Sequence, residues 1–97
     1  MADKIEIENV GQPGKTYRVD AAKFGAMREA VLWALPTDEP GMSVSDLIAK
    51  VKSRLPPELF PDGEKAGWWV KAVQLDLEAK KIIARAAKPP VRLYRLI

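Results

Sequence analysis

The sequence contains no cysteine and no histidine. Without cysteine the chain can form no disulfide bond and no thiolate-bound zinc or iron–sulfur site. Without histidine it lacks the commonest general base and the commonest metal ligand of proteins. No apolar run approaches the roughly 18 residues of a membrane span, and the first residues lack the apolar core of a signal peptide. These absences predict a cytoplasmic protein with no metal, no cofactor and no membrane contact.

The acidic side chains are too dispersed to assemble a catalytic site. Asp38 and Glu39 lie in a stretch between prolines. Asp76 and Glu78 are two positions apart, so they diverge around a helix. No nucleophile, base and oxyanion-stabilising group can be placed together from this pattern. We therefore expect a protein that is not an enzyme.

The chain of 97 residues is long enough for one domain with its own core. No internal repeat, low-complexity run or interior linker divides it. We expect residues 1–97 to form a single α+β domain with a hairpin in 1–19, three helices in 20–80 and a β-ribbon in 82–97.

The first 19 residues carry the pattern of a β-hairpin. Residues 4–9 alternate apolar and polar side chains, and a shorter alternating segment covers residues 16–19. The intervening Gly11–Gly14 cluster supplies the turn.

Two helices are predicted between this hairpin and the middle of the chain. Asp20 is a suitable N-cap for the first helix, which Pro36 ends. Either Ser43 or Ser45 caps the second helix, whose apolar residues follow helical spacing until Pro56.

The third helix is expected to follow Asp62, a plausible cap, and to end at Lys80. One apolar stripe consists of Ala66, Trp69, Val70, Val73 and Leu77, and a second, opposite strip consists of Trp68, Ala72, Leu75 and Ala79. A helix that is apolar on two sides either lies between layers or presents one strip to a partner.

The helix leads directly into a predicted β-ribbon. Residues 82–86 are rich in β-branched side chains, residues 87–90 form a proline corner, and residues 91–96 alternate in the pattern of a strand.

Charge is distributed unevenly along the chain. Residues 1–46 carry five basic and eight acidic side chains, a net charge of −3, whereas residues 47–97 carry eleven basic and five acidic ones, a net charge of +6. This asymmetry indicates either an anionic partner for the C-terminal ribbon or a solvated edge whose charges prevent aggregation.

The run FPDGEKAGWWVKAVQLDLEAKKIIAR resembles a small bacterial family of unknown function. Within it, VKAVQLDLEAKKIIAR resembles the recognition helix and first wing strand of winged helix-turn-helix domains. The resemblance implies a three-helix winged helix-turn-helix core with a C-terminal β-ribbon wing, to which the N-terminal hairpin is added. The chain departs from that pattern at Lys81, where glycine is usual, and in a longer loop before the third helix.

In DNA-binding winged helices the third helix enters the major groove and the wing contacts the backbone or the minor groove. The corresponding nucleic-acid-binding positions are Lys65, Lys71, Gln74, Arg85, Lys88 and Arg92. The wing cations suit phosphate contacts, but Gln74 is the helix's only residue able to read a base edge. This interpretation predicts a bacterial regulator or accessory protein that binds double-stranded DNA mainly through its backbone.

The alternative is a winged helix used for protein contact or homodimerisation through Trp68, Ala72 and Leu75. It depends on where the two adjacent tryptophans lie. Trp68 and Trp69 are either both in the core, or Trp69 is buried while Trp68 anchors a partner. An aromatic platform for unpaired bases would additionally need a groove beside Trp68.

Overall fold

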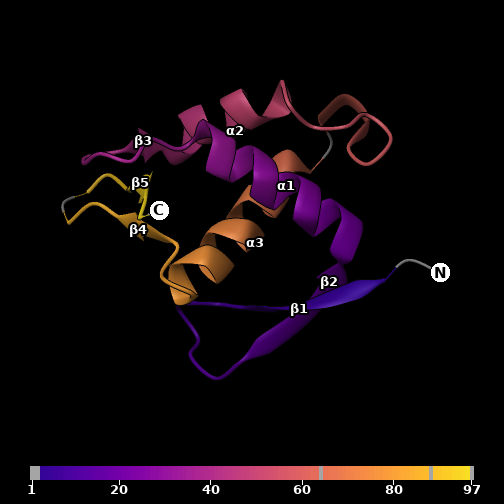
Figure 1. The fold of residues 1–97 in the computed structure, drawn as a ribbon, viewed down its shortest axis with the longest axis horizontal. Helices are drawn as coiled ribbons and strands as arrows, with labels where there is room; N and C mark the ends of the chain where they lie inside the picture. Colours follow the sequence, from indigo (N-terminus) through magenta and orange to yellow (C-terminus); the bar gives the residue numbers. More distant parts are fainter. Residues whose placement is uncertain (1–2, 64, 88, 97) are drawn as a thin grey trace.

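The computed structural model describes residues 3–63, 65–87 and 89–96. Its elements are, in order, β1 (Lys4–Glu8), β2 (Thr16–Asp20), α1 (Ala21–Ala34), β3 (Met42–Ser43), α2 (Val44–Lys52), a 3-10 turn (Pro61–Gly63), α3 (Ala66–Ala79), β4 (Ile83–Arg85) and β5 (Arg92–Arg95) (Figure 1). The α+β class, the three helices, the N-terminal hairpin and the C-terminal ribbon strands are confirmed.

The first two helices begin at the side-chain caps expected from the sequence. The Asp20 carboxylate accepts the Lys23 N–H at 2.9 Å at the start of α1. The Ser43 hydroxyl accepts the Asp46 N–H at 3.2 Å at the start of α2, so Ser43 rather than Ser45 is the cap. The prediction for α3 is wrong at its start, because its N-cap is Lys65 and not Asp62.

The helix α3 lies between the α1–α2 pair and the hairpin (Figure 1). The predicted stripe faces the core, where Val73 is 0% exposed and Trp69 is 8% exposed. Phe60, from the loop before α3, packs edge-on against Trp69 with ring centroids 6.2 Å apart. Burial of this stripe against two helices fixes the orientation of α3, and therefore which side chains it turns outward.

The C-terminus of α3 is closed by a left-handed residue, Lys81, with φ of 61°. The Ile82 N–H donates to the Leu77 carbonyl at 2.9 Å, and the Lys81 N–H donates to the Glu78 carbonyl at 3.1 Å. These two bonds form a Schellman turn. They offset the roughly 1 kcal/mol that a left-handed conformation costs a residue other than glycine, and the turn directs the chain into β4.

The C-terminal sheet has three antiparallel strands in the order β3–β5–β4, one more than the expected ribbon. The extra strand β3 pairs Met42 with Leu93. It has two residues, too few to show alternation in the sequence. Arg95 fastens the same sheet to the end of α1, since its N–H donates to the Pro36 carbonyl at 2.8 Å and its Nε to the Leu35 carbonyl at 3.0 Å.

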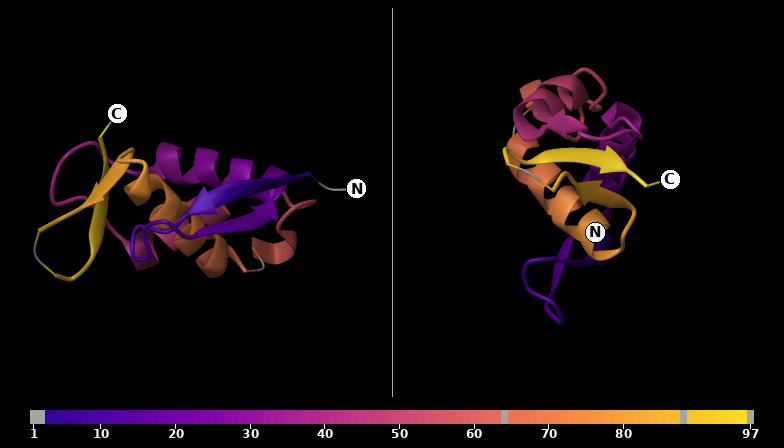
Figure 2. Two further views of the ribbon diagram at one scale, coloured as in Figure 1. Left: turned by 90° about the horizontal axis from the view of Figure 1, so that it is seen from below. Right: turned by 90° about the vertical axis from the view of Figure 1, so that its left-hand side faces the viewer.

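The hairpin has one apolar face and one polar face. Its register pairs Ile5 with Val19 and Ile7 with Tyr17, which places all four side chains on the same face. Only Ile7 is buried, at 4% exposed, whereas Ile5 and Tyr17 stay 39% and 40% exposed. Figure 2 shows the turn of the hairpin projecting away from the helices.

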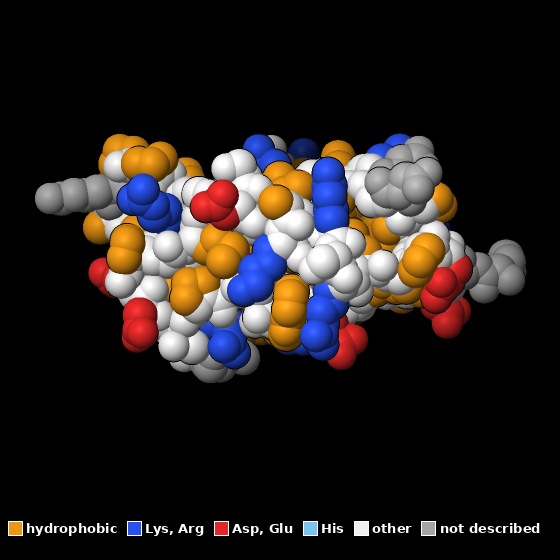
Figure 3. All heavy atoms as spheres, turned by 90° about the horizontal axis from the view of Figure 1, so that it is seen from above, with side chains coloured by type: hydrophobic (Ala, Val, Ile, Leu, Met, Phe, Trp, Pro, Cys, Tyr) orange, Lys and Arg blue, Asp and Glu red, His pale blue; other side chains and the backbone are white. Residues whose placement is uncertain are grey.

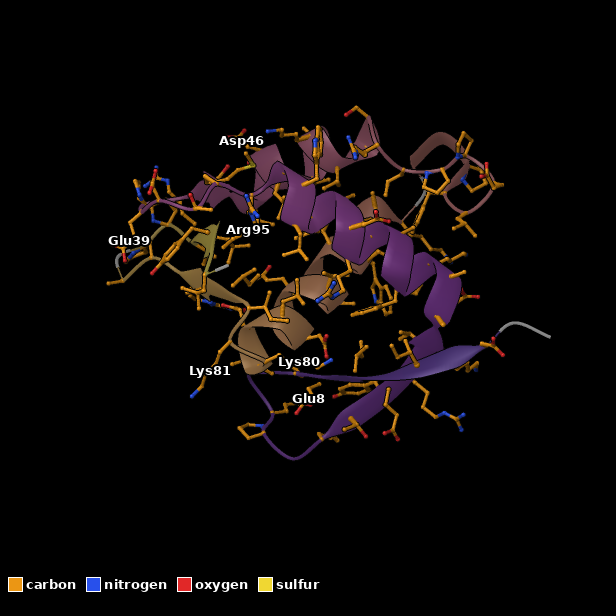
Figure 4. All side chains as sticks on the ribbon, viewed as in Figure 1. Glu8, Glu39, Asp46, Lys80, Lys81 and Arg95 are labelled. Carbon is orange, nitrogen blue, oxygen red and sulfur yellow. The ribbon has the colours of Figure 1, made fainter. Side chains whose placement is uncertain are left out.

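Asp76 fastens the hairpin to α3. Its carboxylate is fully buried and accepts the backbone N–H of Glu8 at 2.8 Å. The Val10 N–H donates to the Leu75 carbonyl at 3.2 Å. The Lys80 Nζ lies 2.9 Å from the same carboxylate and supplies the opposing charge. Figure 4 shows Glu8 and Lys80 on either side of β1, at the end of α3.

Removal of the Asp76 carboxylate should loosen this attachment. We expect Asp76→Ala to lower the free energy of unfolding by about 2–3 kcal/mol, because the Glu8 N–H loses a charged acceptor. Glu8→Ala is the control and should change the free energy of unfolding by at most about 0.5 kcal/mol, since it removes an exposed side chain and keeps the backbone N–H that donates to Asp76. Urea unfolding followed by circular dichroism measures both, and equal losses would contradict this role for Asp76.

Two glycines provide a test of the backbone around the sheet. Gly41 has φ of 89°, and a Cβ there would collide with the Leu93 carbonyl of β5, whereas a Cβ on Gly25 of α1 meets open space. We expect Gly41→Ala to lower the free energy of unfolding by about 2 kcal/mol or more. Gly25→Ala should raise it by about 0.5–1 kcal/mol. Thermal unfolding compares the two, and a Gly41→Ala protein as stable as the parent would refute the close approach of this loop to β5.

The bond between Tyr94 and Glu39 predicts a change in stability at alkaline pH. The Tyr94 hydroxyl donates to Glu39 at 2.8 Å, and this bond, then burial and then the negative charge of Glu39, raises the tyrosine pKa. Because the folded pKa lies above the unfolded value of about 10, the stabilisation is complete below that pH and is lost as pH rises through the folded pKa.

Tyrosinate absorbance in a Tyr17→Phe background, where Tyr94 is the only tyrosine left, measures this pKa. Adding Glu39→Gln should move the midpoint to lower pH. An unchanged midpoint would show that the carboxylate does not act on Tyr94.

Candidate binding site

A groove lies between the hairpin and the outer side of α3, with a volume of about 430 Å³. The hairpin contributes Ile7, Glu8, Asn9, Tyr17, Arg18 and Val19, and α3 contributes Gly67, Trp68, Lys71, Ala72 and Leu75. Most of this lining is apolar. A mainly apolar cleft of this size with a few polar groups is the usual form of a binding site.

The two tryptophans of α3 have different environments. Trp69 is buried, whereas Trp68 remains 58% exposed. Their rings meet edge to face with centroids 4.9 Å apart. The buried ring therefore supports the exposed one from beneath, and Trp68 presents a large apolar surface in a constrained position. Of the two readings of the sequence, the one with both tryptophans in the core is wrong.

The three residues predicted to contact a protein lie in this groove together. Trp68 is exposed, and Ala72 and Leu75 are half-buried along the same side of α3. Tyr17 of β2 lines the same groove and is 40% exposed. Sequence analysis did not associate Tyr17 with these residues, although the apolar alternation of the hairpin was a sign that this face needs a partner surface.

The charged residues of the groove are mainly basic. Arg18 and Lys71 are exposed, and Glu8 is the acidic residue of the lining. Within the part of the chain that the structure describes, neither basic side chain has a hydrogen-bond or ion-pair partner. The groove therefore combines an apolar interior with an exposed lysine on its α3 wall, while Arg18 lies on the polar face of the hairpin, opposite Glu6.

On α3 the residues predicted to bind nucleic acid do not form one surface. Lys65 is exposed at the N-cap, and Lys71 lies in the groove. Gln74 was expected to point away from the core, and this is wrong, because it is 5% exposed and its Nε2 donates to Glu78 at 3.3 Å. The stripe around Val73 is wide enough to include position 74, so the one amide able to read a base edge is used internally.

The predicted wing cations also differ from one another. Arg85 donates to both carboxylate oxygens of Glu78, at 2.6 and 2.9 Å. This bond raises the pKa of Arg85 more than partial burial lowers it, and the charge of Glu78 raises it further. Arg92 is half-buried in β5, opposite Ser43 of β3. Lys88 lies outside the described residues.

A cluster of one tryptophan and two cations, outside the groove, connects α1 and α2. The sequence pattern alone did not indicate it. Trp33 is 43% exposed, with Lys50 Nζ 5.1 Å and Arg54 Cζ 4.6 Å from its ring centroid. Figure 3, which views the molecule from the side of α2, shows basic side chains spread among hydrophobic ones. Both cations make cation–π contacts with this ring, and these contacts hold the two helices together.

Among residues 3–63, 65–87 and 89–96, no helix combines the length and the hydrophobicity that a membrane span requires. In the same part of the chain, no three acidic side chains gather closely enough to hold a metal ion.

Comparison with known proteins identifies a family but no function. No curated protein and no solved structure is significantly similar to the chain. Residues 4–93 match a family described as a family of unknown function (DUF6958), a span that runs from the start of β1 into β5 and contains the whole groove. The match confirms the resemblance to a family of unknown function and assigns no winged helix. The chain belongs to the DUF6958 family.

Proposed function

We propose that the chain is a winged-helix domain that binds another protein, without catalysis, through the groove between its hairpin and α3. The observation that carries the proposal is Trp68, which is 58% exposed inside an apolar groove. An apolar patch exposed in one place marks an interaction site, and tryptophan is favoured among the residues that dominate binding energy at protein interfaces.

The order of the elements supports a winged helix. Three helices precede a β-ribbon, and β3, from between the first two helices, pairs with the second ribbon strand. The third helix packs its Val73 side on the other two and passes directly into β4 through the turn at Lys81. These features support the arrangement that the resemblance implies, with the hairpin added before the first helix.

The position of the hairpin favours protein contact over DNA reading. In a DNA-binding winged helix, the side of the third helix that faces away from the other helices enters the major groove. Here the hairpin lies on that side of α3 and is bonded to it through Asp76 and Leu75 (Figure 1). A duplex would have to displace the hairpin to reach Ala72 and the residues that follow it.

Binding to the phosphate backbone of double-stranded DNA is the second candidate, favoured by the net charge of +6 in residues 47–97. A bacterial regulator or accessory protein would use such binding. Of the predicted cations in the part of the chain that the structure describes, Lys65, Lys71 and Arg92 would make these contacts, because Arg85 is paired with Glu78. Phosphate contacts of this kind produce affinity that falls steeply with salt.

A selection from a phage-displayed library of random peptides tests the first candidate. Enriched peptides are synthesised and titrated into the parent protein, Trp68→Ala and the matched control Trp33→Ala, which removes another exposed tryptophan outside the groove. We expect Trp68→Ala to weaken binding about thirtyfold or more, equivalent to about 2 kcal/mol, because an interface anchor is lost. Trp33→Ala should leave the affinity unchanged.

Two outcomes would contradict protein contact through the groove. One is a selection that yields no peptide sensitive to Trp68→Ala. The other is tight binding of a random-sequence DNA duplex that weakens with salt and with Arg92→Ala but not with Trp68→Ala, which would support the second candidate instead.

A further inference from the structure

The hairpin carries an open strand edge beside the groove. Its sheet contains β1 and β2 alone, so β2 is paired on one side only. The Ala21 N–H donates to the Asp3 carbonyl at 2.9 Å. Hydrogen-bonded and non-hydrogen-bonded residue pairs alternate along an antiparallel ladder, so this bond determines which pairs of β1 and β2 are hydrogen-bonded. Given the register, the backbone N–H and C=O groups of Thr16 and Arg18 point away from β1. These groups are free to pair with an added strand.

The outer edge of β1, on the other side of the hairpin, is already partly bonded to α3. Along β1 the outward N–H of Glu8 already donates to Asp76, and the Val10 N–H donates to Leu75. Among the described residues, the β2 edge has no partner at Thr16 and Arg18, and it adjoins the groove because Tyr17, Arg18 and Val19 of β2 belong to the groove lining.

We propose that the occupant of the groove is an extended acidic peptide segment of a partner protein, added as a third strand on the outer edge of β2. This inference rests on the proposed function and specifies its partner. Main-chain hydrogen bonds to Thr16 and Arg18 provide affinity, and alternate side chains of the added strand point into the groove. A large apolar side chain of the peptide packs there against Trp68 and Tyr17.

Charge selects the acidic partner. Arg18 is exposed and has no hydrogen-bond or ion-pair partner among the described residues, and the register places its side chain on the polar face of the hairpin, opposite Glu6. In an added strand whose apolar side chains enter the groove, the alternate carboxylates lie on that polar face beside Arg18, whereas alternate lysines would place like charges beside it.

The same edge disfavours a second copy of this chain in its simplest arrangement. Two β2 strands paired symmetrically about Arg18 would place the two guanidinium groups directly opposite each other, and like charges at such positions are destabilising. An acidic strand has no such conflict.

Three synthetic peptides test the proposal with the full chain. The first, about nine residues long to exceed a typical strand, alternates glutamate with valine and has a central tryptophan. The second has lysine in place of every glutamate. The third is the acidic peptide with alternate backbone amides N-methylated, which removes the donors of one strand edge. Isothermal titration measures affinity, and amide hydrogen exchange by NMR reports on the Thr16 and Arg18 N–H groups.

We expect the acidic peptide to bind about tenfold or more tightly than the lysine peptide. Arg18→Gln should abolish this preference, and Lys52→Gln, the same charge change on α2 outside the groove, should preserve it. N-methylation should abolish binding, and the acidic peptide should slow exchange at Thr16 and Arg18.

Equal binding of the acidic and lysine peptides, or binding without protection of these amides, would overturn the added-strand proposal. So would a free protein that is dimeric by sedimentation and whose dimer protects the same two amides. If none of the three peptides binds while the random library yields Trp68-dependent binders, the added acidic strand is wrong and protein contact through the groove stands. If neither set binds, both are wrong.

Discussion

The docking of the hairpin on α3 creates the groove between them, and it depends on one buried carboxylate. Asp76 accepts the Glu8 N–H and is paired with Lys80, so a charge that would be costly to bury alone is satisfied on both sides. Without that attachment, Ile7 would lose the surface that buries it, and the second apolar strip of α3 would face solvent. With that attachment, the apolar face of the hairpin covers only part of the second apolar strip of α3, and the uncovered part lines the groove.

Much of this arrangement could be predicted from periodicity and capping. The stripe around Val73, the cap at Asp20 and the strands of the hairpin are local patterns, and the structure has them where the sequence placed them. The sequence departs from the winged-helix pattern at Lys81, where glycine is usual, yet the lysine itself adopts the left-handed conformation. Local patterns were sufficient because each is dictated by neighbours within one or two turns or one strand.

What could not be predicted depends on contacts between distant segments. Strand β3 exists only because β5 lies beside it, and its two residues show no alternation. The role of Asp76 is likewise invisible until Glu8, 68 positions away, is placed next to it. Two of the predicted nucleic-acid residues are used internally for a related reason: Gln74 and Arg85 both donate to Glu78, and that small cluster links α3 to β4.

Backbone hydrogen exchange tests most directly whether the groove exists. The Glu8 and Val10 amides donate to α3, whereas the outward Glu6 amide, on the same edge of β1, has no acceptor among the described residues. We predict slow exchange at Glu8 and Val10 and fast exchange at Glu6. If Glu8 and Val10 exchange as fast as Glu6, the hairpin does not dock on α3, and the binding surface described above does not form.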